Sequence, residues 1–431
     1  GLQGEVAGVQ MTNTSGSPTA TPSFAIRGFG SINAGTSPLI IVDGAPYDGG
    51  WNNLNPNDVA NITVLKDAAS NALYGARGAN GVIMITTKRG SRERATITFD
   101  AKWGANSRAT VDYDRITNPA QYYETYYKAL YNYNVRDKGM SAFDAHATAN
   151  STLGLTGDKG GLGYLVYTVP DGQYLIGANG RMNPNATLGN RVYYGDKFYT
   201  LTPDNWVDES FRTGLRQEYN LNLTGGTEKM NFYASLGYLK NEGVVYCSDF
   251  ERYTARIKAD YQAKKWLKLG ANINYTHTDQ HDVGDGSQSL FDISTRFAPI
   301  YPVYLRDGDG NIMRDEHGRM YDYGAGENAG MNRPSNLEPA RNVLQTNSLN
   351  ANTTFANVMT LNGFVDITPI EGLKFTVNGT VTNNEWKNTS TIQSFYGNTA
   401  TTVPGGEVDK TNYQTFTLNF QQIANYTRSF G

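Results

Sequence analysis

The segment Leu65-Lys-Asp-Ala-Ala-Ser-Asn-Ala-Leu-Tyr-Gly-Ala-Arg-Gly-Ala-Asn-Gly-Val-Ile-Met-Ile-Thr-Thr-Lys-Arg-Gly90 decides the fold of the first part of the chain. Asp67 is a residue type that caps helices, and the helix that it predicts runs from Ala68 to Leu73, with Gly75 at its end. The apolar run Gly81–Thr87 predicts a buried strand. The glycines precede this strand, whereas a phosphate-binding loop follows a strand and opens a helix. The segment is therefore not a nucleotide-binding loop.

Shorter elements precede this segment. Phe24–Gly28 and Pro38–Gly44 are predicted to be strands that stop at a glycine. Asn55-Pro56 places a helix cap before a first-turn proline, and Asn57–Ala60 would form one short turn. Ile62–Leu65 is a further predicted strand. These elements make the first ninety residues a small mixed α+β domain.

Together these elements resemble the plug of SusC/RagA-type TonB-dependent outer-membrane transporters. The quoted segment is similar to the end of that plug. Ile26-Arg-Gly28, Val42-Asp-Gly44 and Leu54-Asn-Pro-Asn-Asp58 resemble its preceding elements in the same order. Siderophore-type relatives carry Gly-Gly-Val-Ile-Asn-Ile where this chain has Ala79-Asn-Gly-Val-Ile-Met84. The TonB box and the N-terminal extension of the family would lie ahead of these residues.

The resemblance implies a plug domain over residues 1–90 and the N-terminal part of a transmembrane β-barrel, with long extracellular loops, over residues 91–431. The glycines of the plug motif are expected to serve tight turns and close backbone packing. Ion pairs between plug and barrel, rather than ligand contacts, are expected for its charged residues Arg27, Asp43, Lys66 and Arg77. The structural motif as a whole comprises Arg27, Gly28, Asp43, Gly44, Lys66, Asp67, Tyr74, Gly75, Arg77, Gly78, Asn80 and Gly81.

Composition restricts the class of protein. The 431 residues include 37 basic and 40 acidic side chains, so no basic surface indicates a nucleic-acid partner. An aromatic content of 12% excludes a disordered chain. The single cysteine, Cys247, excludes a disulfide framework within these residues and a cysteine-based zinc site. No run approaches the ~18 apolar residues of a membrane-spanning helix, and a mean hydropathy of −0.51 is compatible with a β-barrel.

After residue 90, apolar and polar residues alternate with period two, as in strands that have one apolar face. Most runs are near the ~9–11 residues of a membrane-spanning strand. Tyrosine and tryptophan recur at their ends, and short turns alternate with long stretches over 105–216, 280–350 and 384–412. This pattern favours an outer-membrane barrel over a soluble sandwich. The eight candidate strands cover residues 95–103, 217–224, 230–238, 253–261, 267–275, 355–367, 373–382 and 413–427.

The predicted fold is an all-β transmembrane barrel, present in part, with a small α+β plug at its N-terminus. A plugged transporter has about 22 strands, so about 14 would follow the eight seen here. The chain starts at Gly1 without methionine or signal peptide, and we expect it to be a piece of a longer protein. Charged side chains facing lipid cost roughly 2–4 kcal/mol near the midplane, which assigns the two faces. Phe99, Ile257 and Ile273 should face lipid; the lumen should receive Asp100, Lys258 and Asn272.

No catalytic or metal-binding residues are predicted. His277 and His281 have a spacing that binds metal on a helix, but they sit where a strand is expected to run into a loop, which favours solvated side chains. Asp307–Asn311 resembles the start of a calcium loop; Ile312 and Gly318 stand where such a loop needs glycine and glutamate, so a hairpin turn is the better interpretation. No nucleophile–base pattern stands out.

Two plug loops are candidate ligand contacts, because outward plug loops help to bind ligand in the wider transporter class. The better candidate contains Trp51, whose apolar face could stack on a sugar ring or peptide while amides satisfy polar groups. The alternative is that Trp51 packs against the barrel wall. Asn118-Pro119 is expected to open a helix that carries five tyrosines. Two interpretations stay open for them: contact with ligand or a partner, or packing within their own loop. The tyrosines are Tyr122, Tyr123, Tyr126, Tyr127 and Tyr131. The candidate ligand contacts are Ser31, Asn33, Tyr47, Asp48, Trp51, Asn52 and Asn53.

The resemblance implies import of a nutrient oligomer, glycan or peptide, across the bacterial outer membrane, without a cofactor and without enzymatic activity. The implied partners are a SusD-like surface lipoprotein that closes as a lid, TonB with ExbB and ExbD, and outer-membrane lipid. A homodimer of transporter–lid pairs is also compatible with it. Alternatives are a siderophore or cobalamin receptor and, from other classes, a β-rich surface adhesin or an outer-membrane enzyme.

Overall fold

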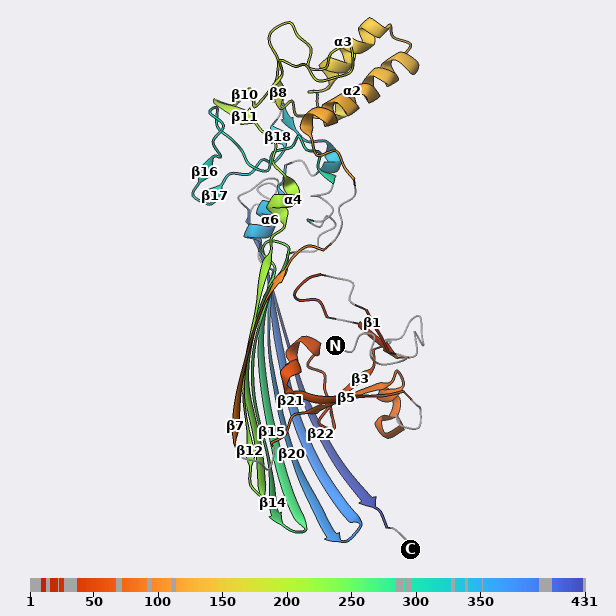
Figure 1. The fold of residues 1–431 in the computed structure, drawn as a ribbon, viewed down its shortest axis with the longest axis vertical. Coiled ribbons are helices and arrows are strands. Elements are labelled where there is room, and N and C mark those ends of the chain that lie inside the picture. Colours follow the sequence, from red (N-terminus) through yellow and green to blue (C-terminus); the bar gives the residue numbers. More distant parts are fainter. Residues whose placement is uncertain are drawn as a thin grey trace.

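The computed structural model describes residues 9–12, 16–21, 23–26, 37–66, 72–90, 95–109, 114–283, 290, 296–326, 330–337, 340–350, 352–394 and 405–428. A curved sheet of eight long strands dominates it (Figure 1). A small N-terminal domain lies on the concave side of the sheet, and a loop domain lies beyond one end of the strands. Within the described ranges, no helix has both the length and the apolar character needed to cross a membrane.

The N-terminal domain is built on a four-stranded sheet in the order β4-β3-β6-β5, in which β3 and β6 are parallel. The strand predicted over Gly81–Thr87 is confirmed as β6. The domain contains β1 (Val9–Thr12) paired with β2 (Ser23–Ile26), β3 (Leu39–Val42), β4 (Ala45–Pro46), β5 (Val59–Leu65), β6 (Val82–Thr87) and the 3₁₀ helices η1 (Trp51–Asn53), η2 (Pro56–Asp58) and η3 (Ala72–Gly78).

Two helix predictions for this domain need correction. Asn55 caps a turn as predicted, since its side chain accepts a hydrogen bond from the Asn57 backbone. The turn ends earlier than Ala60, because Val59 already pairs with Thr87 in the sheet. The predicted helix over 68–73 lies mostly outside the described residues, as does Asp67. The described part of that region is 3₁₀ helix, kinked at Gly75, where φ is 58°.

Strand β6 forms the centre of this domain, and its residues Val82, Ile83 and Ile85 are buried. Ile83 packs with Phe24 and Ile26 on one face, and Val82 packs with Ile41 on the other. Gly81, at the start of the strand, has φ of +92°, and a Cβ there would lie 2.7 Å from Ile26 Cδ1. Only glycine meets both conditions, which accounts for one of the predicted structural glycines.

All eight strands predicted after residue 90 are confirmed, and they form one antiparallel sheet in the order β22-β21-β20-β15-β14-β13-β12-β7. They are 11 to 20 residues long, so most exceed the predicted length. The loop predicted over 384–412 is shorter, because polar residues extend β21 and β22 beyond their apolar runs. The strands are β7 (Thr96–Asn106), β12 (Gly214–Gly226), β13 (Met230–Glu242), β14 (Asp249–Lys264), β15 (Leu267–His281), β20 (Asn352–Ile370), β21 (Leu373–Ile392) and β22 (Glu407–Tyr426).

The two faces of the sheet follow the predicted alternation. Phe99, Ile257 and Ile273 lie on the convex face, exposed at 64%, 59% and 44%. Lys258 and Asn272 lie on the concave face and are buried against the N-terminal domain. Asp100, the last of the six residues whose face was predicted, is exposed. It pairs directly across the strands with the buried Asn220, so it shares the concave face.

Aromatic side chains form a row across the convex face near the end of the strands that carries the loop domain. Trp103, Tyr219, Tyr238 and Tyr253 follow one another on neighbouring strands, with ring centroids 5.8, 6.1 and 4.9 Å apart. Tyr261 and Trp266, both about half exposed, lie near the opposite end. Two aromatic levels with an apolar band between them are typical of strands that cross an outer membrane.

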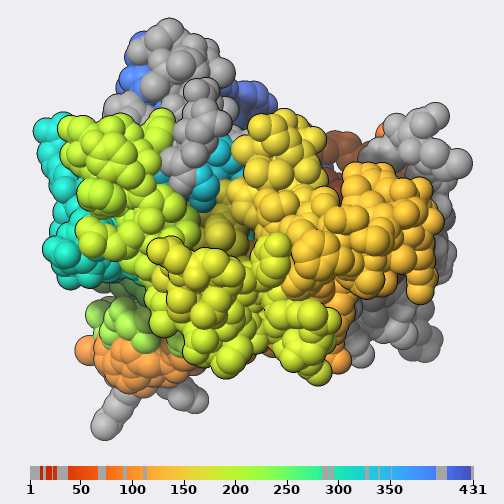
Figure 2. Space-filling view, turned by 90° about the horizontal axis from the view of Figure 1, so that it is seen from above, coloured from red at the N-terminus to blue at the C-terminus, as the bar shows by residue number. Residues whose placement is uncertain are grey.

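Short turns and long connections alternate between the strands, as predicted. Residues 227–229, 265–266 and 371–372 connect strands at one end. The described residues of 107–213 and 282–351 lie at the other end and build the loop domain, which covers most of the face seen from above (Figure 2). Its helices are α2 (Pro119–Arg136), α3 (Ala142–Thr152), α4 (Trp206–Ser210) and α6 (Val343–Leu349), with η4 (Gly157–Lys159) and η5 (Ser335–Leu337).

Four small strand pairs complete the described part of the loop domain. They are β8 (Tyr167–Thr168) with β9 (Thr187–Leu188), β10 (Asn190–Tyr194) with β11 (Lys197–Leu201), β16 (Arg314–Asp315) with β17 (Gly318–Arg319) and β18 (Ala325–Gly326) with β19 (Met331–Asn332).

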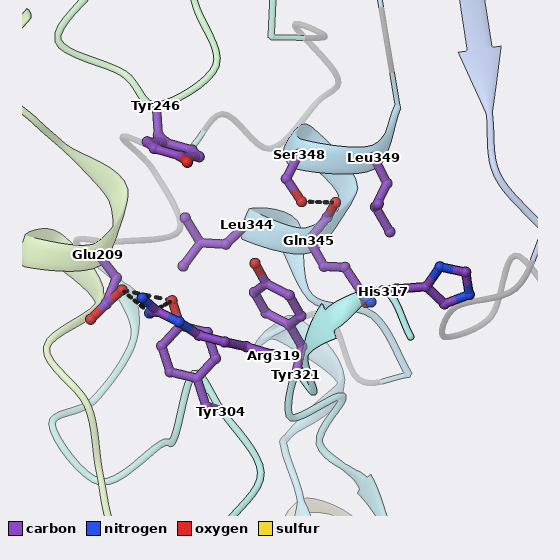
Figure 3. Close-up of a pocket in the computed structure, with 10 residues that line it drawn as sticks. All are labelled: Glu209, Tyr246, Tyr304, His317, Arg319, Tyr321, Leu344, Gln345, Ser348 and Leu349. Atoms are coloured by element: carbon purple, nitrogen blue, oxygen red, sulfur yellow. Dashed lines mark hydrogen bonds and ion pairs between the residues drawn. The ribbon is translucent and has the colours of Figure 1, made fainter. Parts of the chain in front are cut away.

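The loop domain also contains a cavity of about 270 Å³, which lies beside α4 and α6 (Figure 3).

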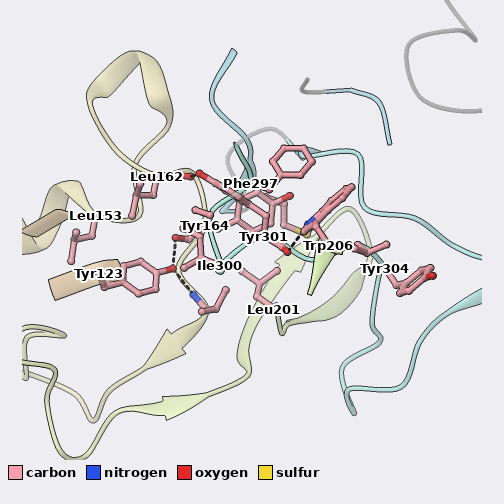
Figure 4. Close-up of a cluster of buried hydrophobic side chains, with 14 of the residues drawn as sticks. Tyr123, Leu153, Leu162, Tyr164, Leu201, Trp206, Phe297, Ile300, Tyr301 and Tyr304 are labelled. Carbon is pink, nitrogen blue, oxygen red and sulfur yellow. Dashed lines mark hydrogen bonds between the residues drawn. The ribbon is translucent and has the colours of Figure 1, made fainter. Parts of the chain in front are cut away.

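A single apolar core joins the two long connections (Figure 4). Tyr123 of α2 is fully buried and donates to the Tyr164 carbonyl at 2.8 Å. Tyr301, from the second connection, donates to the Leu162 carbonyl at 3.0 Å, and the Trp206 indole donates to the Tyr301 carbonyl at 3.0 Å. The helix predicted at Asn118-Pro119 is therefore confirmed, and at Tyr123 the structure favours packing within the loop over an external contact.

Candidate functional site: the interface between the N-terminal domain and the sheet

Asp43 forms the most buried ionic contact of this interface. Its Oδ2 atom lies 2.9 Å from an Arg256 guanidinium nitrogen, 3.0 Å from Lys258 Nζ and 3.1 Å from Asn272 Nδ2. Thr87 of the neighbouring strand β6 donates its backbone N–H to Oδ1 at 3.0 Å and its hydroxyl to Oδ2. The side chains of Asp43, Arg256 and Lys258 are only 4–6% exposed. The N-terminal domain thus inserts one carboxylate between two cations of β14.

The backbone of the β3–β4 turn aims this carboxylate at the sheet. Asp43 has φ of 49° and Gly44 has φ of 89°, so two successive residues occupy the left-handed region. Burial raises the pKa of Asp43, but the Lys258 ammonium, the two Thr87 hydrogen bonds and the Arg256 guanidinium outweigh it. The pKa of this carboxyl therefore lies below its usual value, and the group is ionised at neutral pH.

Residues 52–58 form a second contact with the sheet. Arg252 donates one guanidinium nitrogen to the Asn52 and Leu54 carbonyls, at 3.0 and 2.9 Å. Tyr233 donates its hydroxyl to the Asp58 carboxylate at 2.9 Å. Because two of these partners are backbone carbonyls, the contact with Arg252 holds the main chain of the segment against the sheet.

The Asn55 side chain continues this contact. Its amide donates to Asn220 Oδ1 at 3.0 Å and to Thr254 Oγ1 at 3.1 Å. Gly237 lies directly beneath it, and a Cβ there would approach the Asn55 amide to 2.5 Å. A side chain at position 237 would therefore displace the Asn55 amide from its contacts with Asn220 and Thr254.

Of the predicted ligand-contact residues, Ser31 and Asn33 lie outside the described residues, and the others lie in the loop Tyr47–Asn53. Tyr47 is buried, and the Trp51 ring stacks on Phe24 with centroids 4.5 Å apart. The Asn52 amide donates to the Thr19 carbonyl at 2.9 Å.

Asn53 is likewise occupied by contacts within the protein. Its amide donates to the Gly49 carbonyl, and its own carbonyl accepts from the Thr276 hydroxyl at 2.9 Å. Because the Asn52 and Asn53 amides already have partners, a ligand would have to compete for them. A ligand role for this loop stays a prediction.

The predicted ion pairs have different outcomes. Asp43 pairs with the sheet, as expected. Arg77 pairs with Asp48 of its own domain at 3.0 Å, and both side chains are about half exposed, so a contact of Arg77 with the barrel stays a prediction. Arg27 and Gly28 lie outside the described residues.

Further described residues of the plug motif lie within the N-terminal domain. The Tyr74 hydroxyl lies 3.9 Å from the Met84 sulfur, and the Asn80 amide lies 3.5 Å from the Ser37 carbonyl. Gly44 and Gly75 have positive φ, as Gly81 does. Gly78 is buried, and Lys66 directly follows β5.

Candidate metal sites find no support in the described part of the chain, where no group of three or more His, Cys, Asp or Glu side chains could hold a metal ion. His277 lies near the end of β15 and His281 is its final residue, so the predicted position at the end of a strand is confirmed. The His281 ring lies 2.7 Å from the Asp249 carboxylate. Asp307 accepts the Asn311 backbone N–H at 2.9 Å, which confirms the hairpin turn.

Sequence reasoning missed Arg252 and Tyr233 as partners of the N-terminal domain. A signal was present in β14, where every second residue from Arg252 is polar or charged: Arg252, Thr254, Arg256, Lys258 and Asp260. Buried cations need carbonyl or carboxylate partners. The cations Arg252, Arg256 and Lys258 on one face of a single strand therefore indicate a partner domain that supplies such groups.

Comparison with known proteins identifies this arrangement. The family described as TonB-dependent Receptor Plug Domain matches residues 1–82. TonB-dependent receptor P26 of Formosa agariphila is 28% identical over 374 residues, which are 86% of this chain and 30% of that protein. TonB-dependent receptor SusC of Bacteroides thetaiotaomicron is 30% identical over 315 residues, 71% of this chain and 25% of that protein. The chain thus spans between a quarter and a third of these relatives.

Solved structures agree. The RagAB peptide importer in its closed-closed state matches with a TM-score of 0.69 and 25% identity, over 100% of this chain and 43% of the other. Its open-open state matches with a TM-score of 0.70 and 25% identity, over 99% and 42%. The fold and the plug match define the class: the chain comprises plug and barrel strands of a TonB-dependent receptor. Within that class it belongs to the SusC/RagA type.

Proposed function

We propose that the complete protein imports a nutrient oligomer, a glycan or a peptide, across the bacterial outer membrane, driven by TonB. The supporting observation is the plug, held on the lumen face of the barrel by the buried Asp43 contact with Arg256 and Lys258. A domain held by a few polar contacts on a polar wall can be displaced, whereas an apolar core could not be opened without unfolding. Residues 1–90 are the plug in this proposal, and 91–431 the first part of the barrel.

The convex face supports the outer-membrane location. Tyr253 and Tyr261 are eight residues apart on β14, with the exposed Ile257 midway. At ~3.3 Å per residue and a strand tilt of ~40°, they stand roughly 20 Å apart along the membrane normal. This is comparable with the ~25 Å apolar band of outer-membrane barrels. The loop domain then lies on the extracellular side, where long loops are found.

The proposed partners follow from the same orientation. A SusD-like lipoprotein would close over the extracellular loop domain, and ligand would be captured between this lid, the loops and the plug loop Tyr47–Asn53. The similarity to RagAB, which is described as a peptide importer, supports a peptide as one class of cargo. TonB, with ExbB and ExbD, would pull on the plug from the periplasm. No bond of the oligomer is made or broken, so we assign no cofactor and no catalytic residue.

Displacing the plug requires the Asp43 contacts to be broken in sequence or together. Arg256, Lys258 and Asn272 all converge on one carboxylate oxygen. Water that enters as the plug shifts can solvate these groups one by one, so the pulling force need not overcome the full burial of the charges at once. The contact therefore holds the plug at rest and can still be released by force.

Growth and uptake test this function. A strain that lacks the gene, and the same strain carrying the gene again, are compared on purified oligosaccharides and on defined peptides as sole nutrients. We expect growth to fail on one of these oligomer classes and to return with the gene. A proton-motive-force uncoupler should stop uptake of that oligomer. Uptake that persists with the uncoupler, or growth unaffected on every oligomer, would contradict the proposal.

A further inference from the structure

The cavity of the loop domain is built by segments that are distant in sequence (Figure 3). Glu209 comes from α4, Tyr246 from the connection between β13 and β14, and Gln345 from α6. The remaining wall is a hairpin that contributes Tyr304 and Tyr321. Its volume of about 270 Å³ is slightly below the ~300 Å³ of the smallest typical ligand pockets, so it suits a single ring rather than a long segment.

One wall of the cavity carries fixed donors and acceptors. The Tyr304 hydroxyl donates to the Glu209 carboxylate at 2.7 Å, and Arg319 donates to the Tyr304 hydroxyl at 3.0 Å. The Arg319 guanidinium also lies 5.0 Å above the Tyr304 ring. Burial and the Glu209 hydrogen bond raise the pKa of Tyr304, so its hydroxyl keeps its proton at neutral pH. These groups are held in place before any ligand arrives.

Gln345 adds an acceptor that has no partner. Its side chain lines the cavity and is 7% exposed, and no hydrogen-bond donor reaches its Oε1 atom among the described residues. The helix that carries it is fixed by Asn342, whose amide donates to the Val303 and Asp322 carbonyls at 3.1 and 3.0 Å. A buried acceptor without a donor is unfavourable. A ligand that brings a hydroxyl or N–H group would satisfy it.

Tyrosine rings supply apolar faces to the same cavity. Tyr304 and Tyr321 lie 5.2 Å apart at an angle of 48°. Tyr246 is 52% exposed, and the Arg212 guanidinium lies 5.5 Å from its ring centroid. The cavity therefore combines a carboxylate, a guanidinium and a free amide oxygen with aromatic faces, within the size of one ring.

We propose that this cavity binds one hexose ring of a glycan. A hexose presents hydroxyls that both donate and accept around its edge, and C–H faces that pack on tyrosine rings. A hexose carries hydroxyls around its whole edge and can reach Gln345 and the Glu209–Arg319 wall together, whereas an aliphatic or phenyl side chain of a peptide offers no such hydroxyls. The inference rests on the proposed import function in taking this ring as part of the imported oligomer, and it narrows that oligomer to a glycan.

Binding to the purified complete protein tests this inference. Isothermal titration is carried out with hexasaccharides of glucose, mannose or galactose, and with a tryptic casein digest as the peptide probe. Tyr246→Ala removes an aromatic face, and Gln345→Leu removes the free acceptor at nearly constant volume. Tyr133→Ala is the matched control, because Tyr133 is 51% exposed and has Lys138 at 5.2 Å from its ring, yet lies on α2 away from the cavity.

We expect one hexasaccharide to bind, with affinity reduced about fivefold to tenfold in Tyr246→Ala and Gln345→Leu and unchanged in Tyr133→Ala. Melting temperatures are measured in parallel; Gln345→Leu should keep or raise the melting temperature, since it removes an unpaired buried acceptor. Equal affinity in all variants, or no saccharide binding by the wild type, overturns the proposal. Peptide binding with the same variant pattern overturns the sugar assignment. Saccharide binding without uptake in cells would refute import and leave the cavity assignment standing.

Discussion

Lys258 Nζ of the barrel lies 3.0 Å from Asp43 Oδ2 of the plug, a contact between residues 215 positions apart in sequence. Arg256 reaches the same oxygen at 2.9 Å. Two buried cations thus share one carboxylate, and this carboxylate belongs to the domain that the proposed import would displace. While all partners are present, each buried charge has an opposite charge beside it. Removal of one partner leaves a buried charge without its counter-ion, which lowers the stability of the contact strongly.

Asp43→Asn is therefore expected to weaken the seating of the plug. The substitution keeps the size of the side chain but leaves Arg256 and Lys258 buried without a counter-charge, which costs about 3–5 kcal/mol. Proteolysis of the plug in the purified complete protein measures the effect, and faster cleavage is expected. Asp48→Asn is the matched control, because it breaks the exposed pair with Arg77 and should cost less than about 1 kcal/mol. Equal cleavage rates in the two variants would contradict this role of Asp43.

The same contact predicts a dependence on acid pH. The pKa of Asp43 is lower in the folded protein than its usual value of 3.8. A group with a lowered folded-state pKa contributes stability that is fully present above its unfolded pKa and is lost as the pH falls through the folded pKa. The advantage of wild type over Asp43→Asn should be constant from pH 5 to 8 and shrink below about pH 3.8. Thermal unfolding at several pH values measures it; an advantage that instead declines between pH 8 and 6 would contradict the assignment.

Cysteine labelling tests which face of the sheet meets lipid. The plug covers Lys258 and Asn272, so an aqueous reagent would fail to label cysteines at these positions whichever face of the sheet meets lipid. Tyr413 is the better inward position. It pairs across the strands with Trp386, which pairs with the buried Ala356, and it is 57% exposed.

In a Cys247→Ser background, Tyr413→Cys should react with a water-soluble maleimide in whole membranes, and Ile257→Cys should not. Ile257 is exposed to a similar extent, at 59%, so exposure alone does not separate the two positions. The separation comes from the medium that each face meets. Aqueous labelling of position 257 together with protection of position 413 would sink the assignment of the faces.

Trp51 separates packing from ligand binding. Its ring stacks on Phe24, so Trp51→Ala should lower stability toward the lower end of the ~3–5 kcal/mol seen for buried tryptophan, since Trp51 is only half-buried. The proposed ligand contact predicts in addition a loss of affinity of about 1–3 kcal/mol for the imported oligomer. Trp51→Phe keeps the stack and should largely restore stability. Reduced melting temperature with unchanged affinity would leave Trp51 with a packing role only.

The sequence predicts some levels of this structure well and others poorly. Alternation located all eight strands and placed Ile257 and Lys258 on opposite faces, because a period of two is a local property of the chain. It did not predict that β21 continues to Ile392, since that part of the strand is polar on both faces. Motif resemblance predicted an ionic role for Asp43 and Arg77 alike. Only the fold shows that one reaches the barrel and the other pairs with Asp48.

The loop domain was beyond sequence reasoning. Tyr123 and Tyr301 are 178 residues apart and share one core, and no local pattern encodes such a pairing. For the same reason the cavity between Glu209 and Gln345 could not be found before the structure. The composition of these loops, rich in tyrosine, indicates aromatic packing or binding but not which tyrosine does which.

A cross-link between plug and barrel tests the central claim, that the plug must leave the barrel wall for import. Asn55 Nδ2 lies 3.1 Å from Thr254 Oγ1, so cysteines at these two positions, in a Cys247→Ser background, lie within reach of a short, reducible bis-methanethiosulfonate cross-linker. Cells carrying the complete protein with both cysteines take up a labelled form of the oligomer identified by growth, and each single cysteine variant serves as a control. The account predicts that uptake stops after cross-linking and returns after reduction of the linker. Uptake at the wild-type rate while a gel shows the cross-link intact would contradict it.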